Sequence, residues 1–139
     1  MNGFLLDTNC ISELVRRVPE PRVIRWIDAT DESMLYLSVI TLGEIRKGMA
    51  RLPQGKRRTE LEAWLEMDLP ARFAGKTLTI DAAIADRWGS LTAQAERSGR
   101  RLPPIDGLLA ATAHHHDLVI VSRNSGDFPF SQVFNPWKQ

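Results

Sequence analysis

The sequence predicts an α/β domain with a central, mostly parallel sheet of four to five strands flanked by helices. Short apolar segments, typical of buried strands, alternate along the chain with segments whose apolar residues recur at helical spacing. No repeat, low-complexity tract or long linker interrupts this alternation, and 139 residues is a usual length for one domain. We therefore expect residues 1–139 to form a single domain.

The first half of the chain provides two of the strands, at residues 3–6 and 34–39, because each segment is a run of mostly large apolar side chains. Apolar residues at helical spacing predict a helix over residues 9–17 and another that begins at Pro21, since proline is favoured in the first turn of a helix. A further helix is expected over residues 42–52, where the following proline ends it.

The second half of the chain provides two more strands, "KTLTI" at residues 76–80 and "LVIVS" at residues 118–122. The latter is rich in β-branched residues, which favour strands. The same helical spacing predicts three helices, over residues 61–69, from Ile84 to near Gly99, and over residues 105–116. A short segment, "VFNPW", follows the last of these strands.

The composition excludes several classes of protein. Hydrophobic residues make up 43% of the chain and charged residues 25%, so a packed core is expected. No apolar run approaches the roughly 18 residues of a membrane-spanning helix, and the N-terminus lacks the basic and apolar segments of a signal peptide. The single Cys10 cannot form an internal disulfide, which fits a reducing cytoplasm. The net charge of +1 does not by itself indicate a nucleic-acid partner.

Acidic residues are predicted at or near the carboxyl edge of the sheet, where open α/β sheets place their functional sites. One follows the first strand, one lies in the first turns of the helix after the second strand, one opens the helix at 105–116 and one lies in the loop after "LVIVS": Asp7, Glu44, Asp106 and Asp127. Each of the first three has an ordinary alternative explanation. Asp7 and Asp106 suit the N-termini of helices, and Glu44 alone would be an exposed surface residue.

If these carboxylates share one edge of the sheet, they repel one another, and a divalent cation resolves that conflict. Ligand sets made of oxygen suit Mg²⁺ or Mn²⁺ better than Zn²⁺. Such a site can activate water and stabilise the transition state of phosphodiester hydrolysis.

Four segments of this chain, in order and spacing, resemble the acidic motifs of PIN-domain ribonucleases, with the VapC/FitB toxins of bacterial toxin–antitoxin pairs as the nearest likeness. These segments are "LLDTNCISEL", "VITLGEIRKGM", "PPIDGLLAATA" and "VSRNSGDF", and the closing "VFNPW" is similar to the FitB-type tail. The resemblance covers essentially the whole chain and implies a single PIN-like domain over residues 1–139.

The resemblance also implies roles for particular residues. Asp7, Glu44 and Asp106 are the three main acids of the metal site and the catalytic centre. The family often has a fourth acid where this chain has Asn124, a neutral amide that can still donate an oxygen ligand, and Asp127 is the candidate to supply the missing catalytic charge. Thr8 and Asn9 are the candidates to orient the site.

The segment between Ile45 and Thr59 contains six basic residues and no acidic ones. One interpretation is a solvated helix face and loop. The other is a track for RNA phosphates beside the acids, in which Arg46, Lys47 and Arg51 contact the backbone. The three histidines at residues 114–116 favour a helix C-terminus over a zinc site, because adjacent residues of a helix point in different directions.

The sequence therefore predicts a Mg²⁺- or Mn²⁺-dependent endoribonuclease that acts as the toxin of a type II toxin–antitoxin system. By the same resemblance we expect an RNA substrate, a small antitoxin as partner, a homodimer or higher oligomer, a cytoplasmic location and no membrane partner. Two alternatives are weighed against this hypothesis. A haloacid-dehalogenase-like phosphatase would need a second acid two residues after Asp7, where Asn9 stands. A non-catalytic RNA- or protein-binding module with the same fold is separated from it only by measured cleavage.

Overall fold

The computed structural model describes residues 1–138 and contains one sheet of five strands, in which every neighbouring pair is parallel. The strand order is β3-β2-β1-β4-β5, so the first strand of the chain lies at the centre. The strands are β1 (Gly3–Leu6), β2 (Leu35–Ser38), β3 (Thr77–Leu78), β4 (Leu118–Val121) and β5 (Val133–Phe134). This confirms the predicted α/β class and parallel sheet, and it shows that the closing segment "VFNPW" begins with a fifth strand.

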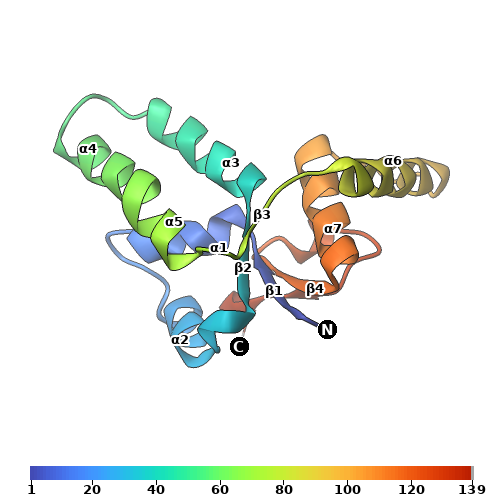
Figure 1. Cartoon of the computed structure of the whole chain (residues 1–139), viewed down its shortest axis with the longest axis horizontal. Helices are drawn as coiled ribbons and strands as arrows, with labels where there is room; N and C mark the ends of the chain where they lie inside the picture. The colour runs from blue at the N-terminus through green and yellow to red at the C-terminus, as the bar shows by residue number, and fades with distance from the viewer. Residues whose placement is uncertain (139) are drawn as a thin grey trace.

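Helices connect the strands and cover the sheet. Figure 1 shows α3, α4 and α5 on one side of the sheet, and α6 and α7 on the other. The α-helices are α1 (Thr8–Ser12), α2 (Pro21–Ala29), α3 (Val39–Ala50), α4 (Lys56–Ala63), α5 (Leu69–Arg72), α6 (Ala82–Arg97) and α7 (Pro104–His116). A turn of π-helix, η3 (Trp64–Asp68), joins α4 to α5, and short 3₁₀ turns are η1 (Glu13–Val15), η2 (Glu32–Met34), η4 (Ser125–Asp127) and η5 (Pro136–Lys138). None of the helices in the described residues is long and apolar enough to cross a membrane.

The predicted helix at residues 9–17 is wrong in its extent, because α1 ends at Ser12 and a 3₁₀ turn follows. Glu13, which opens this 3₁₀ turn, is 3% exposed, and its carboxylate bonds to the backbone of Glu20 beyond the turn. Its carboxylate accepts a hydrogen bond from the backbone N–H of Glu20 at 2.8 Å and another from Arg16 at 2.8 Å. The carboxylate thus fixes the connection to α2.

Two of the predicted strands are also shorter in the structure. The strand predicted to reach residue 39 ends at Ser38, because the Ser38 hydroxyl accepts the N–H of Ile40 and caps α3 at this point. The strand predicted at residues 76–80 is reduced to Thr77–Leu78 at the edge of the sheet.

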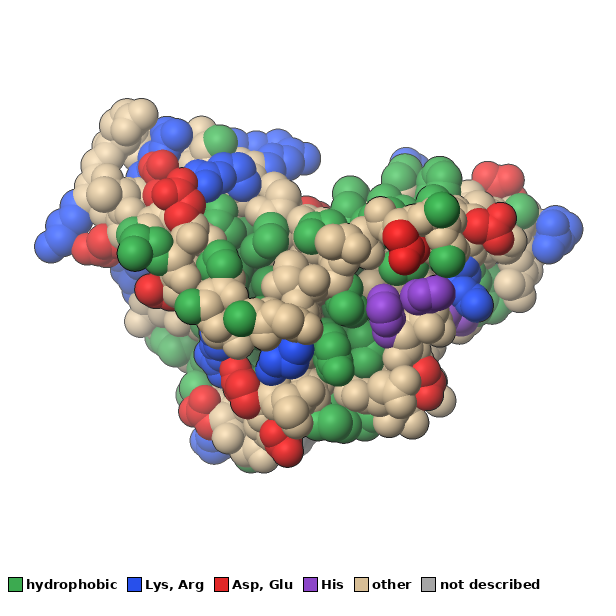
Figure 2. All heavy atoms as spheres, viewed as in Figure 1, with side chains coloured by type: hydrophobic (Ala, Val, Ile, Leu, Met, Phe, Trp, Pro, Cys, Tyr) green, Lys and Arg blue, Asp and Glu red, His purple; other side chains and the backbone are tan. Residues whose placement is uncertain are grey.

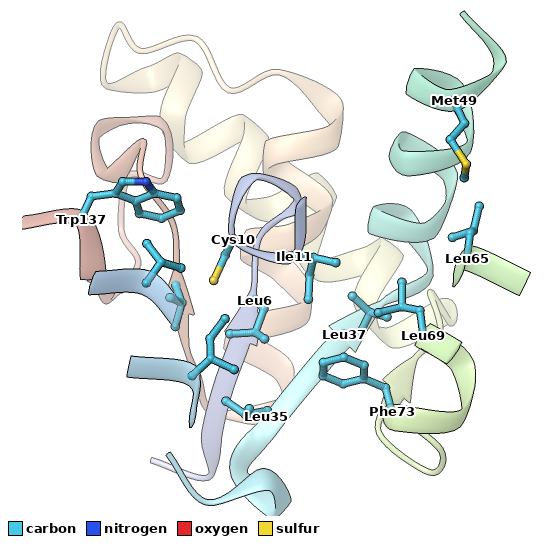
Figure 3. Packing of buried hydrophobic residues seen from close by; sticks show 13 residues of the cluster. Leu6, Cys10, Ile11, Leu35, Leu37, Met49, Leu65, Leu69, Phe73 and Trp137 are labelled. Atoms are coloured by element: carbon cyan, nitrogen blue, oxygen red, sulfur yellow. The ribbon is translucent and has the colours of Figure 1, made fainter. Parts of the chain in front are cut away.

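Apolar side chains fill both sides of the sheet, as a fully covered parallel sheet requires. Neighbouring residues of β1 enter different clusters, with Leu6 in one and Leu5 in the other. Figure 3 shows the cluster that includes Leu6, Leu37, Phe73 and Trp137, which come from β1, β2, the end of α5 and the closing segment. The two clusters hold the helices on either side of the sheet and so fix the carboxyl edge between them.

Helices α6 and α7 pack together closely at Gly107. A Cβ at this glycine would lie 2.8 Å from Cδ1 and 2.9 Å from Nε1 of Trp88, so only a residue without a side chain lets the indole pack here. Gly107 directly follows Asp106, which means that this close approach also sets the position of that carboxylate.

The contact at Gly107 predicts that Gly107→Ala lowers the free energy of unfolding by about 1–3 kcal/mol, the usual cost of overpacking a core. The matched control is Gly89→Ala in α6, where an added Cβ meets nothing within 4 Å. There alanine should stabilise the helix by roughly 0.5–1 kcal/mol. Urea unfolding of both variants provides the measurement, and equal effects of the two substitutions would contradict the packing argument.

Candidate active site

The centre of the candidate site is the carboxyl edge of β1 and β4. Leu6 pairs with Val121 in the parallel ladder, and the next residues along, Asp7 and Ser122, therefore lie side by side. The backbone N–H of Asp7 donates to the carbonyl of Val121 at 2.9 Å, which continues the ladder by one bond. Asp7 is also the N-cap of α1, so the ordinary role and the predicted functional role fall on the same residue.

The Asp7 carboxylate is held from three directions and is only 9% exposed. Its Oδ1 accepts the backbone N–H of Thr8 at 2.8 Å, and its Oδ2 accepts the Ser122 hydroxyl at 2.7 Å. The side-chain amide of Asn9 approaches the same Oδ2 at 3.5 Å. Burial raises the pKa of Asp7 above its ordinary value, the bonds from Ser122 and Thr8 pull it down, and the nearby negative charges raise it again.

Glu44 is joined to Asp7 through one residue. It lies in the second turn of α3, and its Oε1 accepts the Thr8 hydroxyl at 2.6 Å. Thr8 therefore donates its backbone N–H to Asp7 and its hydroxyl to Glu44, which fixes the two carboxylates relative to each other. The structure thus places Thr8 and Asn9 beside the acids, while their predicted role in orienting the site stays a prediction.

Asp106 and Asp127 complete the cluster. Asp106 lies in the first turn of α7 and Asp127 at the end of η4. Partial burial, followed by the charges of Asp127, Asp7 and Glu44, raises the pKa of Asp106 to about 6. All four predicted acids are therefore close enough to act on one another electrostatically. Figure 1 shows α3 on one side of the strands and α6 and α7 on the other, and Figure 2 shows that the surface is hollowed between these two groups of helices.

The negative charge of this cluster is not neutralised within the described part of the chain. None of the four carboxylates forms an ion pair with a described lysine, arginine or histidine. The side chains do not form a closed cage either, because no three described His, Cys, Asp or Glu residues converge closely enough to hold one ion by themselves. A cation here would keep water ligands or draw the side chains inward, and Mg²⁺ usually retains several waters in protein sites.

Ser122 is a site residue to which the sequence analysis assigned no role. Besides its bond to Asp7, its hydroxyl accepts the backbone N–H of Asn124 at 3.0 Å and contacts the Asn9 amide at 3.4 Å. Its signal was present in the sequence, since it is the first polar residue after the apolar "LVIV" strand. Asn124 itself is exposed, and its side chain forms no hydrogen bond with another described residue.

The basic segment divides into paired and unpaired side chains. Arg46 contacts Glu66 at 2.8 Å and Glu62 at 3.9 Å, and so ties α3 to the helical segment that follows it. Lys47 and Arg51 are exposed, and their side chains form no ion pair or hydrogen bond within the described residues. Of the three predicted RNA contacts, these two are the ones whose charge is not already paired.

An apolar groove of about 350 Å³ lies next to the acids, between α1, α3 and α4. Thr8 and Glu44 line it, so it is continuous with the carboxylate cluster. Its apolar lining comes chiefly from Val15, Ile45, Met49, Leu52, Leu61 and Trp64.

The chain is similar to known proteins over nearly its whole length. Residues 4–133 match the family model of the PIN domain. Toxin FitB of Neisseria gonorrhoeae is 39% identical over 136 residues, which are 96% of this chain and 98% of that protein. The VapC ribonuclease Y4jK of Sinorhizobium fredii is 40% identical over 137 residues, which are 97% of this chain and 98% of that protein. The crystal structure of FitAcB from Neisseria gonorrhoeae has a TM-score of 0.93 at 38% identity, and the match covers 98% of this chain and 99% of that chain.

The raised pKa of Asp106 predicts how stability depends on pH in metal-free buffer. The folded protein holds the Asp106 proton more tightly than the unfolded chain does, so the resulting stability is complete below 3.8, the ordinary pKa of this carboxyl, and is lost as pH rises through about 6. Asp106→Asn removes this loss, and its unfolding free energy should rise relative to the native protein between pH 5 and pH 7. Urea unfolding in EDTA measures the difference. Asp86→Asn, at the other end of the α6–α7 pair, is the control, and the prediction fails if both variants change alike with pH.

Proposed function

This chain belongs to the PIN-domain family, and on that premise we propose that it is a metal-dependent endoribonuclease that hydrolyses RNA phosphodiester bonds at its carboxylate cluster. The observation that carries the proposal is the gathering of Asp7, Glu44, Asp106 and Asp127 at one edge of the sheet without a cationic side chain to neutralise them. Such an arrangement is costly unless a cation binds there.

The donor set fits Mg²⁺ or Mn²⁺. Asp7, Glu44 and Asp106 offer carboxylate oxygens, and Asn124 or Asp127 offers the fourth oxygen. Cys10 is buried in the core cluster, and burial raises its pKa to about 12, so it offers no thiolate. Asp127 is the better supported of the last two, because its charge acts on both Asp7 and Asp106. A divalent cation, when bound, lowers the pKa of a coordinated water and offsets the charge that develops on the phosphodiester.

The chain's own residues prepare this edge for the reaction. Ser122 and Thr8 donate to Asp7 and keep its oxygens in a fixed orientation, and the Thr8 hydroxyl does the same for Glu44. Asp106 holds a proton more readily than an ordinary aspartic acid, so a cation competes with that proton once the pH falls to about 6 or below. On the proposal, Lys47 and Arg51 on the exposed side of α3 contact phosphates along the RNA.

We extend the proposal to the biological role: this ribonuclease is the toxin of a type II toxin–antitoxin pair and acts in the cytoplasm. Its similarity to toxin FitB supports this role. The apolar groove beside Glu44 suits an apolar helix of a small antitoxin, and an arginine from that partner would pair with two of the carboxylates through its planar fork. We also propose that the chain forms a homodimer or higher oligomer.

The direct test of the catalytic proposal is to neutralise the acids singly. Asp7→Asn, Glu44→Gln and Asp106→Asn should each lower Mg²⁺-dependent cleavage of an RNA panel by about 100-fold or more, since even residues that only orient metal ligands are worth roughly 10- to 100-fold. Folding should be kept, and added Mg²⁺ should raise the Tm of the native protein more than that of the variants.

Asp86→Asn, an exposed residue of α6, provides the control and should cleave at the native rate. Native-rate cleavage by all three active-site variants would overturn the catalytic assignment. A native protein that binds RNA but never cleaves it would favour the non-catalytic module, an alternative for which the open arrangement of the carboxylates is the supporting observation.

The partner proposal predicts a dimer-sized scattering mass for the isolated protein and a small co-purifying protein that suppresses RNA cleavage. Replacing the arginine that the partner inserts among the carboxylates should restore cleavage even where binding persists, because the apolar groove contact remains. A monomer that expresses harmlessly without any partner would contradict the toxin role and leave the fold assignment intact.

A further inference from the structure

Arg123 lies at the carboxyl edge of the sheet, directly after Ser122. Hydrogen bonds hold both its backbone N–H and its backbone carbonyl. Its N–H donates to the side-chain oxygen of Asn9 at 3.4 Å. Its carbonyl accepts the side-chain amide of Asn135 at 3.1 Å, and the Asn135 oxygen accepts the N–H of Trp137 at 2.9 Å. The closing segment of the chain therefore holds this residue in place beside the acids.

The side chain of Arg123 is held as well. Its guanidinium carbon lies 5.9 Å from the centre of the Trp137 ring, within the range of a cation–π contact. Trp137 is 7% exposed and belongs to the core cluster drawn in Figure 3, so the ring is a rigid support. Arg123 itself is exposed and forms no ion pair with any described carboxylate.

This lack of a carboxylate partner is informative because carboxylates are nearby. Ser122, the preceding residue, is bonded to Asp7, and Asp127 lies four residues further on. An arginine free to turn would pair with them, neutralise the cluster and compete with a cation. The Trp137 ring offers the guanidinium another contact, so the charge of Arg123 stays unpaired while its backbone lies at the same edge of the sheet as Asp7. A guanidinium beside a metal-binding carboxylate cluster suits a ligand with phosphates repeated along a chain. One phosphate would bind at the metal site and a neighbouring phosphate would bind Arg123.

We propose that Arg123 is a substrate-binding residue, whose guanidinium binds an RNA phosphate next to the one that is cleaved, and that Trp137 is the positioning residue that holds it there. The proposal rests on the proposed ribonuclease function. This phosphate contact is separate from the contacts proposed for Lys47 and Arg51. Lys47 lies on α3 and Arg51 caps its C-terminus, whereas Arg123 follows β4. An RNA strand bound by both sets would cross the carboxylate cluster between them.

The test is RNA binding in EDTA, where no cleavage interferes, measured over a range of salt concentrations. Arg123→Ala should weaken binding about tenfold, as expected for one charged hydrogen bond. The slope of log affinity against log salt should shrink by about 0.7, the value for one phosphate contact with a single strand. Arg123→Lys should keep the slope, because the charge is kept, and lose part of the affinity, because the planar group no longer stacks.

Arg87→Ala is the matched control, since Arg87 is also exposed and unpaired in the described residues but lies on α6 beside His115, near the opposite end of α7. It should leave both the affinity and the slope unchanged. Equal affinity and slope for Arg123→Ala and the native protein would overturn the proposal. If the native protein never cleaves RNA with Mg²⁺ but Arg123→Ala still loses the phosphate contact, the ribonuclease function fails and the phosphate-binding role stands.

The positioning role is tested with two substitutions of the ring. Trp137→Phe keeps an aromatic face and should keep the native salt slope, whereas Trp137→Leu should bind RNA more weakly and should lose Mg²⁺ affinity as Arg123 turns toward the acids. Adding Arg123→Ala to Trp137→Leu should restore the Mg²⁺ affinity measured by calorimetry. A core defect alone would not be rescued in this way. Native RNA binding and native Mg²⁺ affinity in a folded Trp137→Leu variant would overturn the positioning role.

Discussion

The repulsion among the four carboxylates is the constraint on which the rest of this structure depends. A parallel sheet brings the ends of β1 and β4 together, and the chain places acids there and on the adjoining starts of α3 and α7. Nothing else in the described chain neutralises them, so the surrounding groups must hold like charges together. Hydrogen-bond donors from Thr8 and Ser122 do part of this, and the packed helices on both sides prevent the acids from moving apart. The uncompensated negative charge that lowers stability here is also what attracts a cation to this edge.

The positive charges are arranged to respect this constraint. Arg46 is close to Glu44 in sequence, but it turns to Glu62 and Glu66 on the neighbouring helical segment. Arg123 directly follows Ser122, which bonds to Asp7, but the Arg123 guanidinium lies over the Trp137 ring. Two carboxylates in the case of Arg46 and an indole ring in the case of Arg123 thus have the same effect. Each contact keeps a guanidinium group from pairing with the acids of the site. A net charge of +1 conceals this separation, because both signs are abundant and are sorted by position.

The sequence alone predicted that the acids lie at one edge of the sheet, because their positions follow from local rules. A carboxylate after an apolar strand, or at a helix start, lies at the carboxyl edge whatever the details of packing. It predicted poorly wherever a distant partner decides the outcome. Glu13, which opens the 3₁₀ turn after α1, bonds to the backbone of Glu20, and Arg46 is paired with Glu66, which lies twenty residues further along. Ser122 is an intermediate case. Its position after an apolar strand can be read from the sequence, but its bond to Asp7 follows only from the register of β1 against β4.

The two outer strands, β3 and β5, contain only two residues each. An outer strand normally exposes a row of free backbone donors and acceptors, on which another chain can build by continuing the sheet. Strands this short offer too few such groups for a second copy to align on. Copies of this protein can therefore accumulate without joining their sheets into a growing ladder, and any specific assembly must use side chains on helical surfaces. Contacts between helical surfaces depend on shape and side-chain chemistry. They can therefore select one partner protein over another, which hydrogen bonding between strand backbones cannot do.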